Sequence, residues 1–247
     1  MRIIATSDAH LPKGEAELQK AIETSCSNGK ADLLILAGDI IDKGRIEFYN
    51  RALDLLSLCE AKTIIGVFGN EEYEELRAEI VRSFSKVVWL DDTYNEFKVN
   101  GEDLLIFGST GILDSPTKWQ RKNIPGIEKK YAYRLEKFGE FLKAEFAGQK
   151  IAIFHYPPTY KTLHGEPTYA WAEMGSAKAE ELIKKYGGVN LIIHGHAHRS
   201  KILQANIGGV EIYNVALPAR KGLFEYHLKK GYRTLLEFMS SEDKKDL

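Results

Sequence analysis

The amino-acid sequence predicts an α/β protein built around a largely parallel β-sheet. Continuous apolar runs of strand length alternate with amphipathic stretches of helical length between residues 2 and 84. Strands separated by helices pair in parallel through right-handed crossovers, which buries both faces of the sheet. The chain has 247 residues, 44% of them apolar, and this is enough for one sizeable core.

The first third of the chain shows this alternation most clearly. Its apolar runs are continuous rather than alternating, so we expect strands that are buried on both faces. The first helical stretch carries Leu18 and Ile22 at helical spacing, and Gly29 is placed to end it. We expect strands at 2–7, 32–38 and 62–69 and helices at 14–29, 46–58 and 71–84.

After residue 84 the pattern changes. The pair Asn100-Gly101 lies between two apolar runs, which predicts a β-hairpin over 96–109. From residue 201 we expect short, mostly antiparallel strands joined by glycine turns. Between these regions we expect a polar loop at 110–130, helices at 131–146 and 177–188, and strands at 150–155 and 189–195. We expect one domain over 1–240, with loop insertions near 109–130 and 156–173 and a polar tail at 241–247.

Composition argues against two classes of function. The 34 basic residues nearly balance the 35 acidic ones, whereas a protein that mainly coats nucleic acid needs a basic excess. No apolar run approaches the roughly 20 residues of a membrane span, so we expect no membrane partner. Cys26 and Cys59 are the only cysteines, and the first residues do not read as a secretory leader. We therefore expect two reduced thiols and a cytoplasmic protein.

Five predicted strands end in imidazole, carboxylate or amide side chains. Open α/β sheets form their ligand sites at the carboxyl ends of the strands. Oxygen and nitrogen donors without thiolate suit Mn, Fe, Zn, Co or Ni, and the number of donors suits two ions rather than one. Two ions about 3.5–4 Å apart form an arrangement that hydrolyses phosphate esters. In chain order, the side chains are Asp8 and His10, Asp39 and Asp42, Asn70 and Glu71, His155, and His196 and His198.

This ordered set resembles the calcineurin-like metallophosphoesterase family, whose motifs are Asp-x-His, Gly-Asp-x-x-Asp, Gly-Asn-His-Asp/Glu, a single His and Gly-His-x-His. The resemblance implies an α/β fold of two facing mixed β-sheets flanked by helices, in four layers. It also implies two divalent transition-metal ions, with Mn preferred and Fe, Zn, Ni or Co as alternatives. The first ion would be held by Asp8, His10, Asp39 and His198. The second would be held by Asn70, His155, His196 and Asp39, which would bridge the two ions.

Three residues near these motifs are not expected to be ligands. Asp42 would orient a ligand or a loop backbone. Glu71 stands where the family has a His that contacts the phosphate and protonates the leaving oxygen. Because an ionised carboxylate would repel a phosphate, we expect Glu71 to turn away and cap the helix that begins there. His194 is expected to be a buried residue that bonds to backbone.

The segment His155–Met174 is rich in aromatic side chains and should overhang the metal ions. We expect Tyr160 and Trp171 to bind the substrate by stacking, and His164 to act as a substitute proton donor. The alternative is that this loop packs on itself or forms a homodimer contact.

Basic side chains near the motifs are candidates for phosphate binding. Arg199 directly follows a ligand motif and would clamp the phosphate. Trp119, with Lys118 and Arg121 beside it, would form an opposite wall of the site. The alternative for this second group is a solvated basic face.

Together these features predict a dinuclear metal-dependent phosphoesterase. The resemblance implies that a hydroxide bridging the two ions attacks phosphorus in line. The expected substrate is a phosphodiester or a small phosphate monoester, nucleotide-like in character. Two alternatives stay open: a nuclease of the same family, which would need a basic DNA-facing surface, and a non-catalytic binding scaffold that keeps the fold.

Overall fold

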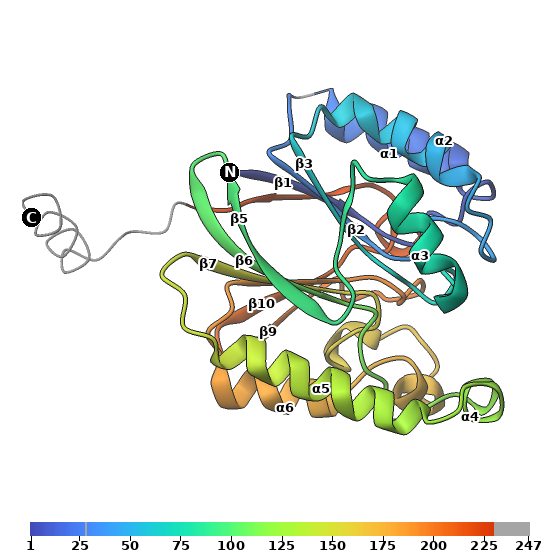
Figure 1. Ribbon diagram of the computed structural model, residues 1–247, viewed down its shortest axis with the longest axis vertical. Helices are drawn as coiled ribbons and strands as arrows, with labels where there is room; N and C mark the ends of the chain where they lie inside the picture. Colours follow the sequence, from blue (N-terminus) through green and yellow to red (C-terminus); the bar gives the residue numbers. More distant parts are fainter. Residues whose placement is uncertain (28, 230–247) are drawn as a thin grey trace, which may run out of the picture.

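A computed structural model describes residues 1–27 and 29–229 of the protein. It contains two mixed β-sheets that face each other, with helices on both outer faces (Figure 1). One sheet has the strand order β11-β1-β2-β3-β4 and the other has the order β5-β6-β7-β8-β10-β9. The predicted fold of two facing mixed sheets flanked by helices is therefore confirmed.

The first sheet follows the strand–helix alternation of the sequence. Its strands are β1 (Arg2–Thr6), β2 (Leu33–Ala37), β3 (Thr63–Val67), β4 (Val88–Trp89) and β11 (Phe224–His227). The first four pair in parallel, and β11 joins β1 antiparallel. Strand β4 was not predicted, because two residues are too few to carry a periodic pattern. The associated helices are α1 (Glu15–Cys26), α2 (Phe48–Leu56) and α3 (Glu74–Ser83).

The second sheet begins with the predicted hairpin. Its strands are β5 (Thr93–Val99), β6 (Glu102–Ser109), β7 (Gln149–Phe154), β8 (Leu191–His194), β9 (Gln204–Ile207) and β10 (Val210–Asn214). The hairpin turn at Asn100 and Gly101 has positive φ at both residues, as a two-residue turn requires. Strand β10 pairs antiparallel with β9 but parallel with β8, so the expectation of mostly antiparallel strands holds only in part. The polar tail expected at 241–247 lies outside the described residues.

Three apolar layers hold the sheets and helices together. The middle layer lies between the sheets and contains Ile35 and Ile65 from one sheet and Ile106 and Ile153 from the other, all fully buried. One outer layer packs α1 and α2 on the first sheet. The other packs helices α5 (Ile127–Lys143) and α6 (Ala177–Tyr186) on the second. Each fully buried Ile side chain contributes roughly 1.5–3 kcal/mol to folding, which explains the continuous apolar runs.

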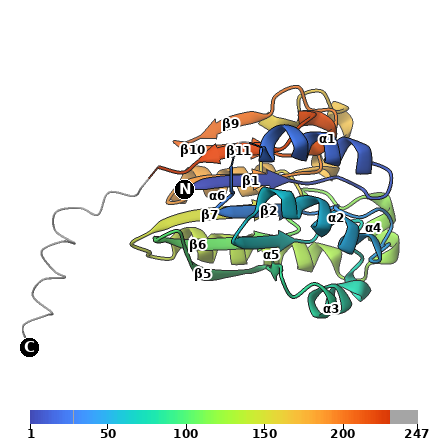
Figure 2. The same ribbon diagram turned by 90° about the horizontal axis from the view of Figure 1, so that it is seen from above.

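Both segments expected as loop insertions contain short helices. The first holds α4 (Lys118–Asn123), which begins with a capping box formed by Thr117 and Gln120. The second holds the 3₁₀ turns η2 (Lys161–Leu163) and η3 (Thr168–Glu173). Figures 1 and 2 place α3 and α4 toward the end of the molecule at which β1 ends. The remaining short elements are η1 (Ser57–Cys59) and α7 (Leu217–Arg220).

The two cysteines form a disulfide, which corrects the expectation that they stay as reduced thiols. Cys26 at the end of α1 is joined to Cys59 in η1, across 33 residues of chain. Both lie in the apolar layer outside the first sheet. They meet because α1 and the turn after α2 pack together, which their spacing in the sequence does not reveal. A bond that closes a loop of this length typically stabilises a fold by about 2–4 kcal/mol.

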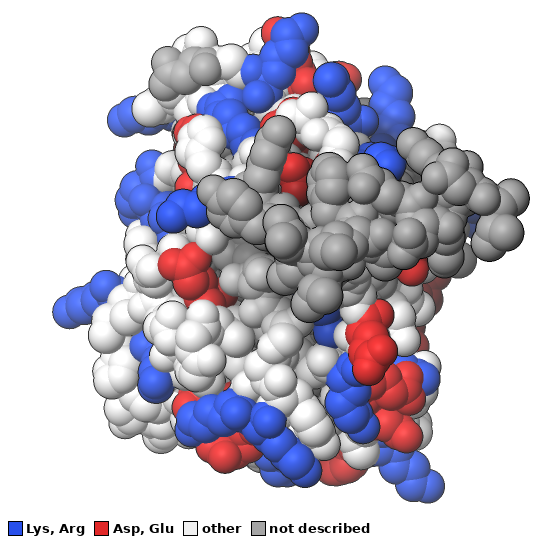
Figure 3. All heavy atoms as spheres, turned by 90° about the vertical axis from the view of Figure 1, so that its left-hand side faces the viewer, with Lys and Arg blue, Asp and Glu red and all other residues white. Residues whose placement is uncertain are grey.

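The helices and the charged surface of the described residues bear on possible partners. Within residues 1–27 and 29–229, no helix is long and apolar enough to cross a membrane. Figure 3 shows the face opposite the end at which β1 ends, and basic and acidic side chains are interspersed on it.

Candidate metal centre

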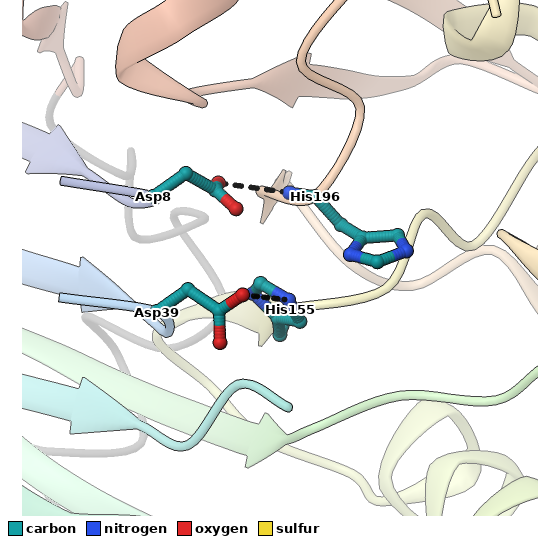
Figure 4. A group of neighbouring side chains, drawn as sticks. All are labelled: Asp8, Asp39, His155 and His196. Atoms are coloured by element: carbon teal, nitrogen blue, oxygen red, sulfur yellow. Dashed lines mark hydrogen bonds and ion pairs between the residues drawn. The ribbon is translucent and has the colours of Figure 1, made fainter. Parts of the chain in front are cut away.

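Side chains from the ends of both sheets meet at one place. Asp8 follows β1 and Asp39 follows β2, and these adjacent strands are held in register by parallel pairing. The loops beyond them stay paired, since Asp8 N–H donates to the Gly38 carbonyl at 3.0 Å. The second sheet contributes His155 after β7 and His196 after β8. Figure 4 shows the two carboxylates extending from their strands toward these histidines.

One group of four potential ligands lies at the centre. Ligand atoms of Asp8, Asp39, His155 and His196 all lie within 4.8 Å of one another. Asp39 Oδ2 is 3.3 Å from His155 Nε2, and Asp8 Oδ2 accepts a hydrogen bond from His196 N–H at 2.9 Å. Both carboxylates are 1% exposed. Two buried negative charges this close together require a positive charge between or beside them.

A second group of three shares Asp8 with the first. It consists of Asp8, His10 and His198, whose ligand atoms also lie within 4.8 Å of one another. Asp8 Oδ1 is 2.8 Å from His198 Nε2, and the Nε2 atoms of His198 and His10 are 3.4 Å apart. Nitrogen atoms that converge on one carboxylate in this way suit a bound cation.

Asn70 completes the set expected from the sequence. It follows β3, and its Oδ1 lies 3.1 Å from His155 Nε2. The structure therefore brings together all seven expected ligands, in two adjoining groups. The carboxylate common to both groups is Asp8, whereas the sequence comparison implied Asp39 as the bridge. The assignment of each ligand to one ion stays a prediction.

The protonation of the cluster also fits a metal site. Burial alone would lower the pKa of His155, but the charge of Asp39 raises it to about 9. Burial lowers the pKa of His196 to about 3, so its ring is neutral and free to coordinate. A divalent ion would replace the positive charge that His155 otherwise supplies to the two carboxylates. The donor set thus fits one or two divalent ions.

The backbone at the cluster is strained. Asp8, His10, Asp39 and His196 all have positive φ, between 47° and 69°. This left-handed conformation typically costs a non-glycine residue about 1–3 kcal/mol, and such residues concentrate at functional sites. Here the conformation directs four candidate ligands toward one point.

Two motif glycines are required by close approach to these ligands. A Cβ on Gly69 would overlap the carboxylate and backbone of Asp39. A Cβ on Gly195 would lie 2.6 Å from Asp8 Oδ2. Both distances are shorter than real Cβ contacts, so a larger residue at either position would displace a ligand carboxylate.

Glu72 is a supporting residue that the sequence analysis missed. Its side chain is fully buried and accepts hydrogen bonds from the backbone N–H groups of Gly69 and Asp39 at 2.7 and 2.8 Å, and from Tyr49 Oη at 2.8 Å. Burial and the charge of Asp39 raise the pKa of Glu72 to about 6. Glu72 therefore ties the loop after β2 to the loop after β3. Its place in the Gly-Asn-Glu-Glu motif was the only available signal.

Glu71 does not cap α3, which corrects that expectation. The helix begins three residues later, at Glu74, with no side-chain cap, because the chain first turns to bury Glu72. The Glu71 carboxylate instead accepts a hydrogen bond from Lys43 N–H at 2.7 Å and from the Asn70 amide at 3.3 Å. The second contact leaves the Asn70 carbonyl oxygen facing His155.

Asp42 and His194 have partners of their own. Asp42 Oδ1 lies 2.8 Å from Lys13 Nζ, and Asp42 belongs to neither ligand group. His194 is fully buried, with Nδ1 bonded to the Gly195 carbonyl and Nε2 to Thr162 Oγ1, each at 2.8 Å. Since both ring nitrogens are occupied, this geometry agrees with a structural role for His194.

Side chains of the segment His155–Met174 have partners within the protein. Trp171 Nε1 donates to the Glu166 carbonyl at 3.1 Å, and the His164 ring packs edge-on against Trp171 with centroids 5.0 Å apart. These two contacts lie within the segment and favour the self-packing alternative. Tyr160 Oη instead donates to Asp114, outside the segment, at 2.6 Å. The expected roles of the three side chains stay predictions.

Arg199 is exposed, and its backbone N–H is bonded to Glu166 Oε1 at 2.7 Å. Among residues 1–27 and 29–229, no side-chain hydrogen bond or ion pair of Arg199 tests its expected role as a phosphate clamp. Arg121 pairs with Glu173 at 3.5 Å, while Trp119 is 66% exposed.

Comparison with known proteins identifies the family. The sequence pattern of the family described as calcineurin-like phosphoesterase matches residues 1–200. The chain belongs to this family. It is accordingly a metal-dependent phosphoesterase, as predicted, with a possible metal site formed by Asp and His side chains.

Individual members of the family are only distantly similar. A protein of Arcobacter nitrofigilis named as a probable glycerophosphodiester phosphodiesterase, GpdQ, is 26% identical over 212 residues, covering 81% of this chain and 72% of the relative. The crystal structure of the phosphopantetheinyl hydrolase PptH from Mycobacterium tuberculosis superposes with a TM-score of 0.65 at 15% identity, covering 93% and 97% of the two chains. A dimetal phosphatase from Danio rerio superposes with a TM-score of 0.55 at 14% identity, covering 92% of each chain. At these identities the two structures support the fold alone.

Proposed function

We propose that the protein is a dinuclear phosphoesterase that hydrolyses phosphodiesters or small phosphate monoesters with nucleotide-like organic groups. The observation that carries this proposal is the pair of adjoining ligand groups that share the carboxylate of Asp8. One group offers four ligands and the other three, which suits two ions better than one. Mn²⁺ is the preferred ion because the ligands are oxygen and nitrogen atoms without thiolate, and Fe, Zn, Ni and Co are the alternatives.

The chain's own residues would prepare the site for a phosphate. Asp8, His10 and His198 would hold one ion, and Asn70, His155 and His196 would contribute to the other. Asp39, as the family resemblance implies, or Asp8, which is common to both ligand groups, would bridge the two ions. Two divalent ions in such a site lower the pKa of water to supply a nucleophile and stabilise the charge of the transferring phosphoryl group. Asn70 is neutral, so the ligand set carries only two carboxylates and leaves net positive charge for a phosphate. Glu72 would keep the loops that carry Asp39 and Asn70 in register.

The diester substrate is supported by the curated relative, which is named as a phosphodiesterase. Either kind of ester needs less from a general acid when its leaving group is weakly basic. This matters here because Glu71 stands where the family has a His and its carboxylate is held by Lys43 N–H.

Two other functions are less well supported. A nuclease would need a basic surface for the nucleic-acid backbone, whereas the 34 basic residues of the chain are balanced by 35 acidic ones. A non-catalytic scaffold would not need four strained residues and two buried carboxylates at one point.

We also propose that the protein acts on small phosphate esters in the cytoplasm. A separate alternative is that the segment 156–173 forms a homodimer contact. The Cys26–Cys59 disulfide counts against a cytoplasmic location, because reducing cytosol normally keeps such pairs as thiols. Cell fractionation with thiol trapping would test the compartment and the redox state of Cys26 and Cys59. A protein found only in oxidised form outside the cytosol would contradict the cytoplasmic location.

Metal stoichiometry with matched variants tests the proposed function. The wild type reconstituted with Mn²⁺ should bind about two ions per chain and hydrolyse bis(p-nitrophenyl) phosphate. Asp8→Asn and Asp39→Asn should each lower the metal content, and the variant that loses both ions identifies the bridging carboxylate. Asp54→Asn, an exposed position on α2, is the control and should behave as the wild type. A folded, metal-loaded protein that hydrolyses neither diesters nor monoesters would support the scaffold instead.

A further inference from the structure

A cavity of about 650 Å³ opens between α3 and the segment formed by α4 and the start of α5. Its lining includes Gly69 and Asn70, so Asn70 belongs both to the cavity wall and to the candidate ligand set. Cavities that bind small organic molecules typically have volumes of about 300–1,000 Å³. The cavity therefore has the size and the position to hold the organic part of an ester whose phosphate lies at the metal centre.

We propose that this cavity binds the organic group of the substrate, and that this group is flat, ring-containing and uncharged, as a nucleoside is. The inference rests on the proposed phosphoesterase function, because it concerns the group attached to the phosphate. Three features carry it: the pairing of the cations in the cavity, the aromatic side chains, and the volume.

The cations that line the cavity are already paired with acidic side chains. Arg77 Nη1 lies 2.9 Å from Asp91 Oδ1, Lys130 Nζ lies 2.6 Å from Glu74 Oε2, and Arg134 Nε lies 3.0 Å from Asp92 Oδ2. Arg77 also donates to Thr110 Oγ1, and Arg134 to the Gly111 carbonyl. A second phosphate or a carboxylate on the ligand would have to displace these partners. The cavity thus favours an uncharged group.

The aromatic side chains provide surfaces for a flat ring. Trp119 lines the cavity and is 66% exposed, an uncommon state for the largest apolar side chain. Its helix is held by the Thr117–Gln120 capping box, so the indole is presented from an ordered element. Tyr131 and Tyr156 also line the cavity, and both side chains are buried.

The two amide side chains beside Trp119 already have hydrogen-bond partners within the protein. Gln120 Oε1 accepts a hydrogen bond from Thr117 N–H at 2.9 Å, and Asn123 Nδ2 donates to the Trp119 carbonyl at 2.8 Å. Gln120 Nε2 has only a long contact of 3.5 Å with Tyr156 Oη. Recognition would then depend on stacking and shape, which tolerate any base.

The volume distinguishes a ring-containing group from a small alcohol. The curated relative is named for glycerophosphodiesters, and a glycerol or methyl group would leave most of a cavity of about 650 Å³ unfilled. A nucleoside would fill more of it and reach Trp119.

Two diesters with the same leaving group test the proposal on the Mn²⁺-loaded full chain. These are the p-nitrophenyl ester of thymidine 5′-phosphate and methyl p-nitrophenyl phosphate, which differ only in the group that would enter the cavity. The wild type should prefer the thymidine ester in kcat/KM. Trp119→Ala should reduce this preference by about 5- to 150-fold, the contribution expected from one stacked base, mainly through KM. Trp119→Phe should retain part of it.

Tyr133→Ala is the matched control, because Tyr133 is an exposed ring on α5 that does not line the cavity. It should leave the preference between the two esters as in the wild type. A wild type that hydrolyses both esters equally, or a Trp119→Ala variant that keeps the preference, overturns the cavity proposal while the phosphoesterase function stands. Failure to hydrolyse either ester overturns the proposed function instead.

A binding measurement that does not depend on turnover separates these outcomes further. Thymidine should quench the fluorescence of the wild type, and the quenching should disappear in Trp119→Phe, in which Trp89 and Trp171 remain.

Glu74→Gln should release Lys130 and raise the relative rate for a thymidine ester that carries a 3′-phosphate. If Glu74→Gln left the response to that added charge unchanged, the argument from paired cations would be wrong.

Discussion

Two segments with exposed or partly exposed aromatic side chains lie near the metal centre, and they differ in whether those side chains already have partners. In residues 156–174, Tyr160 is bonded to Asp114 and Trp171 to the Glu166 carbonyl. In the α4 segment, Trp119 is 66% exposed beside an open cavity of about 650 Å³. Tyr169 is the exception in the first segment, since 89% of it is exposed.

The difference shows what aromatic content in a sequence does not reveal. The segment 156–174 follows a ligand directly and is rich in rings, so the sequence favoured it as the substrate-binding wall. In the structure the polar atoms of Tyr160 and Trp171 form hydrogen bonds with other residues of the protein. Such bonds fix the conformation of the loop and leave these atoms without free donors for a ligand. The α4 segment has a single Trp, but that ring lines an open cavity.

The largest expected effect concerns the protonation of the leaving oxygen. If His164 donated that proton, the segment 156–174 would take part in catalysis. General acid catalysis contributes about 10²–10⁴-fold and matters most for basic leaving groups. Because Glu71 replaces the family's His, we expect the rate of the wild type with Mn²⁺ to fall steeply as the leaving-group pKa rises. Glu71→His should flatten this dependence, and Glu71→Gln is the matched control that should leave it steep.

His164→Gln measures the contribution of the first segment to the same series. Its ring packs on Trp171, so we expect a leaving-group dependence as steep as in the wild type. A shallow slope in the wild type that becomes steep in His164→Gln would show that the segment supplies the acid, and the contrast between the two segments would then fail.

Glu72→Gln tests the support of the metal centre itself, because Glu72 ties the loop after β2 to the loop after β3. Replacing one carboxylate oxygen by an amide removes an acceptor from the Gly69 and Asp39 backbone N–H groups. Partners that orient metal ligands typically contribute 10- to 100-fold in metal affinity or activity. We expect a loss of Mn²⁺ affinity in this range by titration calorimetry, with equal losses on thymidine and methyl esters. An unequal loss would mean that Glu72 acts on the cavity as well.

Tyr160→Phe should affect stability rather than substrate choice. It removes the hydrogen bond to the Asp114 carboxylate, which is worth about 1.5–3 kcal/mol when the acceptor is charged. Thermal unfolding should therefore shift down by several degrees. The preference between thymidine and methyl esters should stay as in the wild type, in contrast to Trp119→Ala. A lost preference with unchanged stability would assign Tyr160 to the substrate.

The smallest effect is expected at His194. Both of its ring nitrogens are occupied by Gly195 and Thr162, so His194→Gln should leave the Mn²⁺ content near that of the wild type. His196→Gln, two residues later, should lower it. Elemental analysis of both variants checks this, and equal metal loss would contradict the division of the cluster.

The sequence by itself determined the types of ligands and where they come along the chain. Each motif is a short stretch that directly follows an apolar run, as in Ser7-Asp8 after β1 and Gly38-Asp39 after β2. Such a run must be buried, and parallel strands bring their carboxyl ends to one edge. For this reason the strand ends alone gave nine candidate side chains, and the family resemblance then implied which seven of them are ligands.

The tertiary structure decided what depends on contacts between distant residues. The cluster joins the ends of two sheets, Cys26 meets Cys59 across 33 residues, and Glu72 reaches the backbone of Asp39. Whether Tyr160 or Trp119 faces open space likewise depends on the segments packed against each. Periodicity describes only neighbours along the chain, so it carries no information on which distant atoms become partners and which stay free.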